Sequence, residues 1–322
     1  MKTILVTGVA GFIGSHVADA LLARGDSVIG LDNFNDYYDP ARKEANLEEV
    51  LAANTHGRFE LLRADIRNRD LIDRIVAERK PDVIVHLAAM AGVRASMEAP
   101  HLYYEVNLTG TLNLLESARK AGCMEVVFAG TSSAYGATDV QPFVESDRGD
   151  RPLAPYPASK RAAEMLGFTY HHLYGMSFTA LRFFTVYGPR ARPDMMAFKV
   201  LSNIFTGEEV PLYEGGKMKR DWTYVGDITQ GVVRAIDRPL GYEVINLGRG
   251  EEVLLSDFVQ RVEQLAGRKA NLRAEPKPLA DVFETRADIS KARALLGYDP
   301  KVSVLEGTEL FWKWYERAVL KR

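Results

Sequence analysis

The stretch that decides the fold is Thr7-Gly8-Val9-Ala10-Gly11-Phe12-Ile13-Gly14. It follows the β-branched segment Thr3 to Thr7 and opens an apolar helical pattern from about Phe12 to Arg24. Glycines between a strand and a helix permit a tight turn and let the backbone touch a pyrophosphate at the positive end of the helix. The spacing is Gly-x-x-Gly-x-x-Gly rather than the commoner Gly-x-Gly-x-x-Gly. We therefore expect a dinucleotide to bind at Gly8, Gly11, Phe12, Ile13 and Gly14.

The second strand ends at Asp32, at the distance from the glycines where a carboxylate accepts hydrogen bonds from the adenosine ribose of a dinucleotide. The next basic residue is Arg42, so a 2'-phosphate would meet Asp32 without an obvious cationic partner. This pattern favours NAD over NADP. The charged residues from Arg42 to Glu49 are expected to form the solvated face of a helix.

Short β-branched runs alternate with longer amphipathic segments, which is typical of a parallel sheet covered by helices on both faces. The expected strands are Thr3 to Thr7, Ser27 to Asp32, Phe59 to Arg63, Val83 to Leu87, Glu125 to Gly130 and Ser177 to Phe183. The pattern predicts an α/β fold with a Rossmann-type doubly wound sheet over residues 1–184. A smaller, discontinuous C-terminal lobe is expected over 185–322, with residues 225–250 rejoining the first domain.

The composition excludes several classes of protein. The chain has 322 residues, of which 47% are hydrophobic and 26% charged, and its formal net charge is -2. The basic residues are dispersed along the chain, which does not suit binding of nucleic acid. No apolar run approaches the roughly 20 residues that are needed to span a bilayer. We expect a cytoplasmic protein without a membrane partner. The single cysteine, Cys123, is expected to be buried, and the adjacent His171 and His172 diverge on one helix, which argues against a metal site.

A second constellation is Tyr156-Pro157-Ala158-Ser159-Lys160 at the start of a helix. Residues four apart share a helical face, so the Lys160 ammonium can lie beneath the Tyr156 phenol and, together with a positive nicotinamide ring, lower its pKa. Tyr156 would then act as a base near neutral pH. The hydroxyls of Thr131 and Ser132, at the end of the preceding strand, are expected to bond a sugar oxygen undergoing oxidation.

Together these motifs resemble the extended short-chain dehydrogenase/reductase family over essentially the whole chain. The resemblance also includes His86-Leu87-Ala88-Ala89, Leu181-Arg182-Phe183-Phe184 and Arg220-Asp221-Trp222-Thr223-Tyr224. It implies that the cofactor meets Asn33, Asp65, Ile66, Leu87, Ala88, Ala89 and Phe184, together with Tyr156 and Lys160. For the nucleotide of a UDP-sugar it implies Tyr213 at the uracil, Arg220 at the diphosphate and Asp281 at the ribose.

Within this family the residues after Thr131 distinguish the reactions. Dehydratases carry an Asp-Glu pair where this chain has Ser132-Ser133, and decarboxylases of UDP-glucuronate typically carry Glu in place of Ser133. The resemblance therefore implies epimerisation at C4 of the sugar. A module that senses NAD without turnover would need only the glycines and Asp32, and the presence of Tyr156, Lys160 and Thr131 argues against it.

Two further stretches resemble UDP-glucuronate 4-epimerases: Asp32 to Pro40 and Phe184 to Met195, together with Ala91-Gly92-Val93-Arg94. A cationic guanidinium beside a hydroxyl suits the planar C6 carboxylate, so Arg192 and Thr185 are expected to bind it, with Ser133 nearby. Arg94 is assigned to the substrate or its phosphates. Met90, Ala191 and Gly226 depart from the pattern. A UDP-glucose/UDP-galactose 4-epimerase is the first alternative and a UDP-glucuronate decarboxylase the second. The helices near Leu102 to Ala121 and Pro157 to Tyr174 resemble the pair that forms a homodimer in this family.

Overall fold

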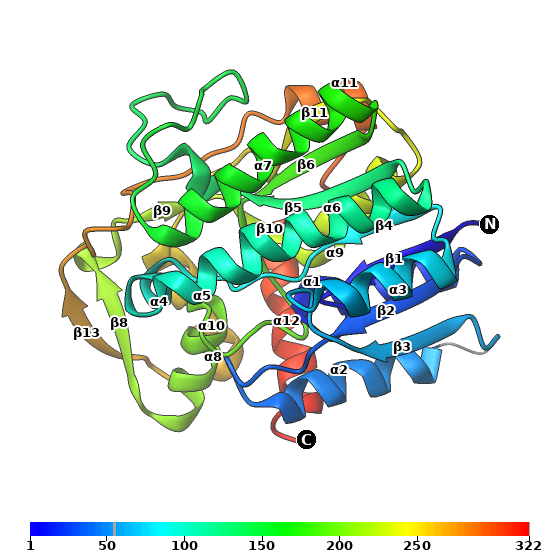
Figure 1. Ribbon diagram of the computed structural model, residues 1–322. Coiled ribbons are helices and arrows are strands. Elements are labelled where there is room, and N and C mark those ends of the chain that lie inside the picture. The colour runs from blue at the N-terminus through cyan, green and yellow to red at the C-terminus, as the bar shows by residue number, and fades with distance from the viewer. Residues whose placement is uncertain (54–55, 322) are drawn as a thin grey trace.

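The computed structural model describes residues 1–53 and 56–321, and its centre is a seven-stranded sheet (Figure 1). The strand order is β11-β6-β5-β4-β1-β2-β3, and every pair of neighbours is parallel. The strands are β1 (Thr3–Thr7), β2 (Ser27–Asp32), β3 (Phe59–Arg63), β4 (Val83–His86), β5 (Glu125–Thr131), β6 (Ser177–Phe183) and β11 (Tyr242–Leu247). The predicted fold class, an α/β protein with a Rossmann-type parallel sheet, is confirmed.

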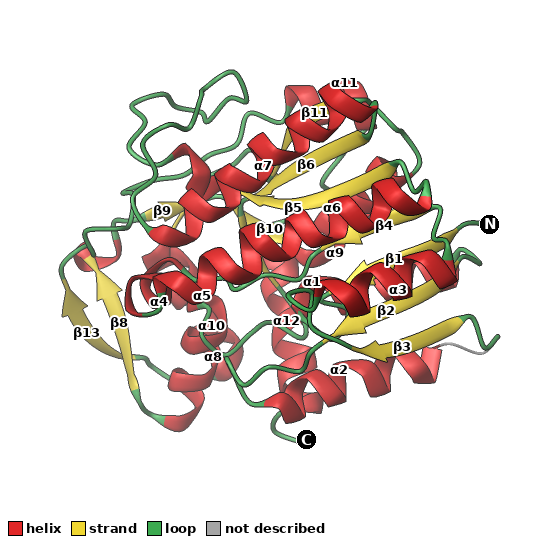
Figure 2. Ribbon diagram, viewed as in Figure 1, coloured by secondary structure: helices red, strands yellow, loops and turns green. Residues whose placement is uncertain are grey.

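Helices cover both faces of this sheet (Figure 2). On one face lie α3 (Arg69–Arg79), α6 (Gly110–Ala121) and α7 (Pro155–Tyr174), and α1 (Phe12–Ala23) packs against both α2 (Pro40–Ala53) and α9 (Val225–Ile236) on the other. Successive residues of β1 feed separate apolar layers, because Ile4 and Val6 belong to one cluster and Leu5 to the other. This alternation within a buried strand is what a doubly wound sheet requires.

The remaining elements lie outside the central sheet. Short helices at 93–104 are α4 (Val93–Glu98) and α5 (Pro100–Tyr104), followed by the π-turn η1 (Glu105–Thr109), and the 3-10 turn η2 (Ser132–Tyr135) follows β5. The C-terminal part contains β7 (Thr185–Tyr187), α8 (Met196–Thr206), β8 (Glu209–Tyr213), η3 (Glu214–Gly216), β9 (Lys219–Arg220), β10 (Trp222–Tyr224), β12 (Val253–Leu254), α10 (Leu255–Ala266), β13 (Asn271–Glu275), α11 (Ser290–Leu296) and α12 (Val304–Ala318). Although β11 pairs with β6, the division into two domains at residue 184 stays a prediction.

Two local features position the site. The helix α7 starts with Pro155, whose fixed φ suits the first helical turn, and ends at Gly175 with φ 70°. The strand β4 ends at His86, whose Nδ1 lies 2.8 Å from the Thr7 hydroxyl and whose Nε2 lies 3.0 Å from the Thr111 hydroxyl. Burial lowers the pKa of His86 to about 3, so this side chain is a neutral core residue that ties two strands to α6.

Cys123 is buried as expected, and burial raises its thiol pKa to about 11.

In the part of the chain that the structure covers, every helix is too short or too polar to traverse a bilayer.

Candidate active site

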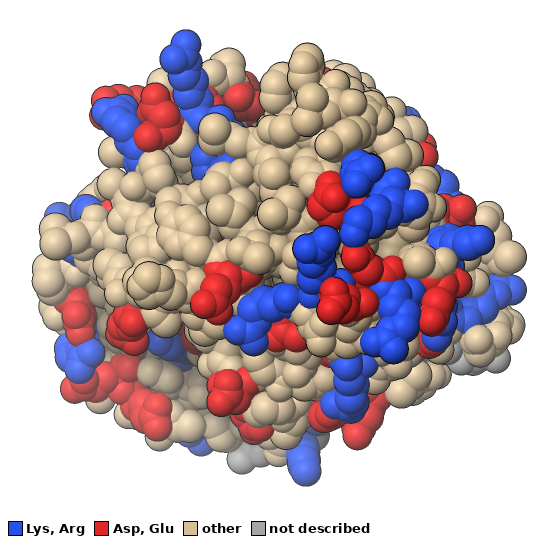
Figure 3. Space-filling view, in the orientation of Figure 1, with Lys and Arg blue, Asp and Glu red and all other residues tan. Residues whose placement is uncertain are grey.

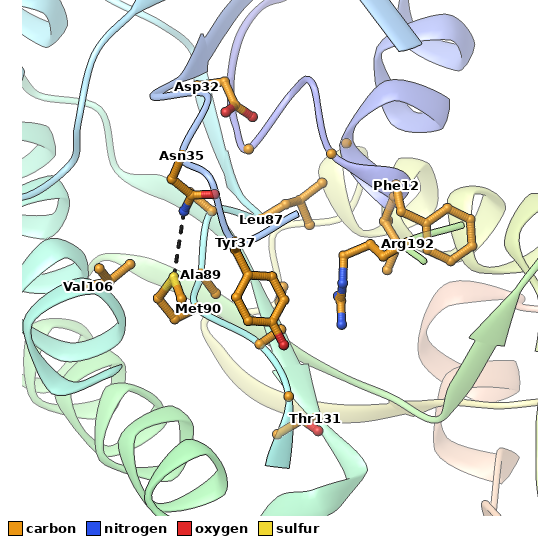
Figure 4. Close-up of a pocket in the computed structure, with 18 of the residues that line it drawn as sticks. Phe12, Asp32, Asn35, Tyr37, Leu87, Ala89, Met90, Val106, Thr131 and Arg192 are labelled. Carbon is orange, nitrogen blue, oxygen red and sulfur yellow. Dashed lines mark hydrogen bonds between the residues drawn. The ribbon is translucent and has the colours of Figure 1, made fainter. Parts of the chain in front are cut away.

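A cavity of about 350 Å³ runs along the carboxyl edge of the sheet (Figure 4). All residues expected to bind the cofactor line it: Gly8, Gly11, Phe12, Ile13, Gly14, Asp32, Asn33, Asp65, Ile66, Leu87, Ala88, Ala89, Tyr156, Lys160 and Phe184. Residues 156 and 160 come from α7, far from the glycine turn in the sequence. The fold therefore brings the two predicted constellations to one cavity.

The glycine turn leaves no space for side chains. Gly8 has φ 70°, and a Cβ at this residue would lie 2.8 Å from the backbone nitrogen of Ala88. A Cβ at Gly14 would lie 2.1 Å from the carbonyl oxygen of Gly8. The helix α1 begins after Gly11 without a side-chain cap. Its first N–H groups are therefore available to an anionic ligand.

Asp32 is held by backbone donors and by one cation. Its Oδ2 accepts a hydrogen bond from the amide of Ala10 at 3.1 Å, and its Oδ1 accepts one from the amide of Phe34 at 2.9 Å. Lys43 Nζ lies 3.9 Å from Oδ1. Burial raises the pKa of Asp32, while Lys43 and these hydrogen bonds lower it. The carboxylate is thus fixed at the end of β2, where it can accept hydrogen bonds from a ribose.

Lys43 corrects one sequence prediction. The segment from Arg42 to Glu49 was expected to be a solvated face, but Lys43 is only 5% exposed and lines the cavity. Its ammonium also donates to Asn35, to the carbonyl oxygen at 3.0 Å and to Oδ1 at 2.6 Å. A basic residue therefore does follow Asp32 in space. Its ammonium is hydrogen-bonded to Asn35 and is the counter-charge of the Asp32 carboxylate.

Tyr156 and Thr131 meet where β5 ends and α7 begins. Both side chains line the cavity, and the ring of Tyr103 lies edge-on to the Tyr156 ring, with 6.1 Å between the two ring centres. Burial raises the pKa of Tyr156, while the Thr131 hydroxyl and the charge of Arg192 lower it. The net shift from these causes is upward. The lowering expected from Lys160 together with a positive nicotinamide ring stays a prediction. Deprotonation of the phenol needs further positive charge in the cavity.

Lys160 reaches the cavity from the buried side of α7. Its Nζ lies 4.0 Å from the centre of the Phe128 ring, and burial lowers the pKa of Lys160 to about 7, while the charge of Glu164 raises it. Glu164, one turn further along, is fully buried and accepts two hydrogen bonds from Arg182, at 3.0 and 2.8 Å. Lys160 can thus lose or gain a proton near neutral pH.

A second cavity, of about 90 Å³, adjoins the first, because Thr185 lines both. Ser132, Ser133, Arg220 and Asp281 also line it. The predicted catalytic residues Thr131 and Tyr156 therefore lie on the cofactor side of this junction, as does Arg192, whereas Ser132 and three predicted substrate residues lie beyond it.

Arg220 is oriented by backbone carbonyls. It donates to the carbonyl oxygens of Lys219, Phe283 and Val282 at 2.8, 3.0 and 3.0 Å. Burial lowers its pKa, although the charge of Asp281 raises it. These contacts fix the guanidinium at the wall of the second cavity.

Arg94 and Tyr213 line neither of these two cavities but are bonded to each other. Arg94 Nη1 donates to the Tyr213 hydroxyl at 2.5 Å, and Nη2 donates to Asp281 Oδ2 at 3.0 Å. The Arg94 guanidinium also lies 4.6 Å from the centre of the Tyr213 ring. Arg94 therefore links two residues that the sequence assigned to the uridine end of the substrate.

Arg192 projects into the main cavity beside Tyr37 (Figure 4). Its Nε donates to Asp194 Oδ1 at 2.9 Å and its Nη2 to Asp194 Oδ2 at 3.0 Å. The Tyr37 hydroxyl donates to the same Oδ2 at 3.3 Å. Asp194 and Tyr37 are not among the site residues predicted from the sequence, and the structure adds them as partners of Arg192 and of each other.

The family model described as the NAD dependent epimerase/dehydratase family matches residues 4–248. The chain belongs to this family. The match confirms the family resemblance found in the sequence, and it confirms the expectation that NAD is the cofactor.

Relatives narrow the comparison within the NAD dependent epimerase/dehydratase family. A UDP-glucuronate 4-epimerase of Thermodesulfobacterium geofontis is 43% identical over 320 residues, which are 99% of this chain and 98% of the relative. The crystal structure of UDP-glucuronic acid 4-epimerase from Bacillus cereus, in complex with UDP-glucuronic acid and NAD, aligns at a TM-score of 0.90 with 33% identity, over 98% of this chain and 99% of that one.

A UDP-glucose 4-epimerase from Thermotoga maritima, solved with UDP-glucose, aligns at a TM-score of 0.88 with 30% identity, over 98% of this chain and 99% of that one. The backbone of this chain thus matches the UDP-glucose and the UDP-glucuronic acid 4-epimerase almost equally well. Within the epimerase/dehydratase family, the substrate must be argued from side chains.

The cavity fits the cofactor that family membership implies. Gly8 and Gly14 let the turn pack tightly against neighbouring backbone, and the uncapped start of α1 supplies N–H donors for a pyrophosphate. Asp32 supplies acceptors for a ribose. Glycine spacing and strand ends are local features, so the sequence alone could name these residues as candidates for binding the cofactor.

Proposed function

We propose that the protein is a UDP-glucuronate 4-epimerase, which converts UDP-glucuronate to UDP-galacturonate through a transient 4-keto sugar. The observation that carries this proposal is that Arg192, Thr185 and Tyr156 line one cavity. Tyr156 supplies the group for C4 chemistry, while a guanidinium and a hydroxyl suit a C6 carboxylate two carbons away on the same sugar. The named relatives support the same assignment.

In the proposed reaction, Tyr156 transfers one proton. The Tyr156 phenolate accepts the proton of the C4 hydroxyl while Thr131 bonds the same oxygen, and after the sugar presents its other face Tyr156 returns that proton. Lys160 holds positive charge beneath this region when protonated. The chemistry that bound NAD supplies is acceptance and return of the C4 hydride, and its nicotinamide adds the positive charge that the phenol needs. No atom is gained or lost over the cycle.

The second cavity is proposed to hold the nucleotide. Arg220 is the proposed contact for the diphosphate, because backbone carbonyls fix its guanidinium at the wall. Asp281 is proposed to accept from the uridine ribose and Tyr213 to stack on the uracil, with Arg94 bracing both. Ser132 and Ser133 are proposed to donate to the sugar at the junction. A neutral Ser133 leaves no carboxylate there of the kind that marks the decarboxylases.

NAD is expected to copurify with the protein, because the hydride returns to the same cofactor and no exchange is needed for turnover. Heat-denatured protein should release NAD, and the purified protein should turn over UDP-glucuronate with no cofactor added. Chromatography of the released nucleotide and a turnover assay check both points. Release of NADP alone, or strict dependence on an added reductant, would contradict the assignment of Asp32.

We further infer a cytoplasmic homodimer built on α6 and α7. Figure 3 shows few charged side chains over α7 and the start of α6. The exposed apolar residues there are Leu112 (39%), Met165 (59%), Phe168 (52%), Leu173 (59%) and Tyr174 (44%). An apolar face of this kind supports association.

Light scattering at micromolar concentration should give twice the chain mass, and Phe168→Glu should shift the measured mass to that of the monomer. A monomeric parental protein would overturn this proposal.

A further inference from the structure

The guanidinium of Arg192 has two edges that can bind a carboxylate. Nε and Nη2 form the side edge, and Nη1 and Nη2 form the end edge. Asp194 occupies the side edge, through the bonds of 2.9 and 3.0 Å described above. The end edge keeps two N–H groups for another carboxylate, and Arg192 lines the cavity that Tyr156 and Thr185 also line.

Asp194 is itself held by the wall of the cavity. The Tyr37 hydroxyl bonds its Oδ2, and the Tyr37 ring centre lies 6.0 Å from the Arg192 guanidinium carbon. The Tyr37 hydroxyl packs closely against Gly92, because a Cβ added to Gly92 would lie only 2.6 Å from it. Burial raises the pKa of Asp194, but the charge and hydrogen bonds of Arg192 outweigh it, so the pKa is below its usual value. Asp194 is therefore an ionised carboxylate in a fixed position.

We propose that Asp194 is a positioning residue for substrate selection: it aims the end edge of Arg192 at the C6 carboxylate and, as a second carboxylate on one guanidinium, limits how tightly that carboxylate is held. This inference rests on the proposed function. Two carboxylates that share a guanidinium repel each other, so the bond to the substrate is weaker than an isolated Arg192 would make.

A limited grip suits the reaction. The 4-keto sugar must turn to present its other face to the hydride, so its carboxylate has to leave and meet Arg192 again during each turnover. Without a second carboxylate beside it, the Arg192 guanidinium would bind the C6 carboxylate so tightly that rotation of the 4-keto sugar would be slow. With Asp194 in place, Arg192 distinguishes an anionic from a neutral sugar without retaining the anion.

The test measures binding of UDP-glucuronate, UDP-galacturonate and UDP-glucose by calorimetry in the NAD-bound Tyr156→Phe background, in which the sugars are not interconverted. Adding Asp194→Asn should raise the affinity for both uronates by about fivefold or more, because the repulsion is removed, and should change that for UDP-glucose by less than about twofold. In active protein, Asp194→Asn should lower kcat and KM for UDP-glucuronate together. Asp194→Glu, which keeps the charge, should raise uronate affinity by less than Asp194→Asn does.

Arg192 provides the matched control. In an Arg192→Ala background, Asp194→Asn should increase uronate affinity by a clearly different factor than it does with Arg192 present, which is the coupling that a double-mutant cycle measures. Uronate affinity that is unchanged or reduced in Asp194→Asn, or equal changes for all three sugars, would overturn the proposal. If Asp194→Asn fails to retain NAD, the same titration with Asp194→Ser decides. Turnover of UDP-glucuronate by the parental protein tests the proposed function separately.

Discussion

Replacement of Tyr156 by phenylalanine is expected to reduce kcat for epimerisation by at least about 100-fold, because the phenol oxygen that takes the C4 hydroxyl proton is lost. The ring itself remains, so its edge contact with Tyr103 and the packing at the start of α7 are kept. Binding of the sugar nucleotide should change little, since the proposed nucleotide contacts lie in the second cavity. Single-turnover absorbance at the nicotinamide band, together with calorimetry, separates the two effects.

A matched control for this substitution lies at the other end of the same helix. Tyr174 is exposed at the C-terminus of α7, so Tyr174→Phe removes an identical hydroxyl and should leave kcat near the parental value. If Tyr156→Phe retained more than about a tenth of kcat, the assignment of Tyr156 as the base would be wrong.

Replacement of Arg192 by alanine is expected to lower epimerisation and to divert turnovers toward loss of CO2. Oxidation at C4 of UDP-glucuronate creates a ketone whose C6 carboxylate is β to it, and such acids lose CO2 readily. The loss is easiest when the C5–C6 bond stands perpendicular to the carbonyl plane, because the breaking bond then overlaps the π system that receives its electrons. Arg192 and Thr185 are proposed to hold the carboxylate away from that alignment.

The magnitude follows from the strength of such contacts. Charge-assisted hydrogen bonds of roughly 1.5–3 kcal/mol bias a conformer population by about 10- to 100-fold and can still be broken in each cycle. Without Arg192, Asp194 also loses its cation and repels the substrate. The fraction of turnovers that end in UDP-4-keto-pentose and CO2 should therefore rise, as measured by NMR and by CO2 capture. Arg273→Ala, at an exposed position of β13, is the control. Parental epimerisation by Arg192→Ala without added CO2 would refute the carboxylate assignment.

The sequence predicts the cofactor end of the molecule well, because the decisive features there are local. The strand from Ser27 to Asp32 has the predicted bounds, and the turn from Gly8 to Gly14 forms where the glycine spacing places it. In each case the residue type and its neighbours along the chain determine the backbone that binds the ligand.

The substrate end depends on contacts between segments that are far apart in the sequence. Lys43 looks like part of a charged helix face, yet the tertiary fold buries it beside Asp32. Likewise, the spacing of Tyr156 and Lys160 predicts their proximity but gives no measure of burial, which raises the phenol pKa. Asp194 lies two residues from Arg192 in the printed sequence, but only the path of the loop shows that the two side chains pair.

The most direct test of the account follows the C4 hydrogen in deuterated water. The purified protein is incubated without added cofactor, with UDP-glucuronate in one sample and UDP-glucose in another, and the products are identified by NMR. We predict UDP-galacturonate that keeps protium at C4, because the hydride never exchanges with solvent, and conversion of UDP-glucose at no more than about one hundredth of the rate. Deuterium at C4, an absence of UDP-galacturonate, or faster conversion of UDP-glucose would contradict the proposed function.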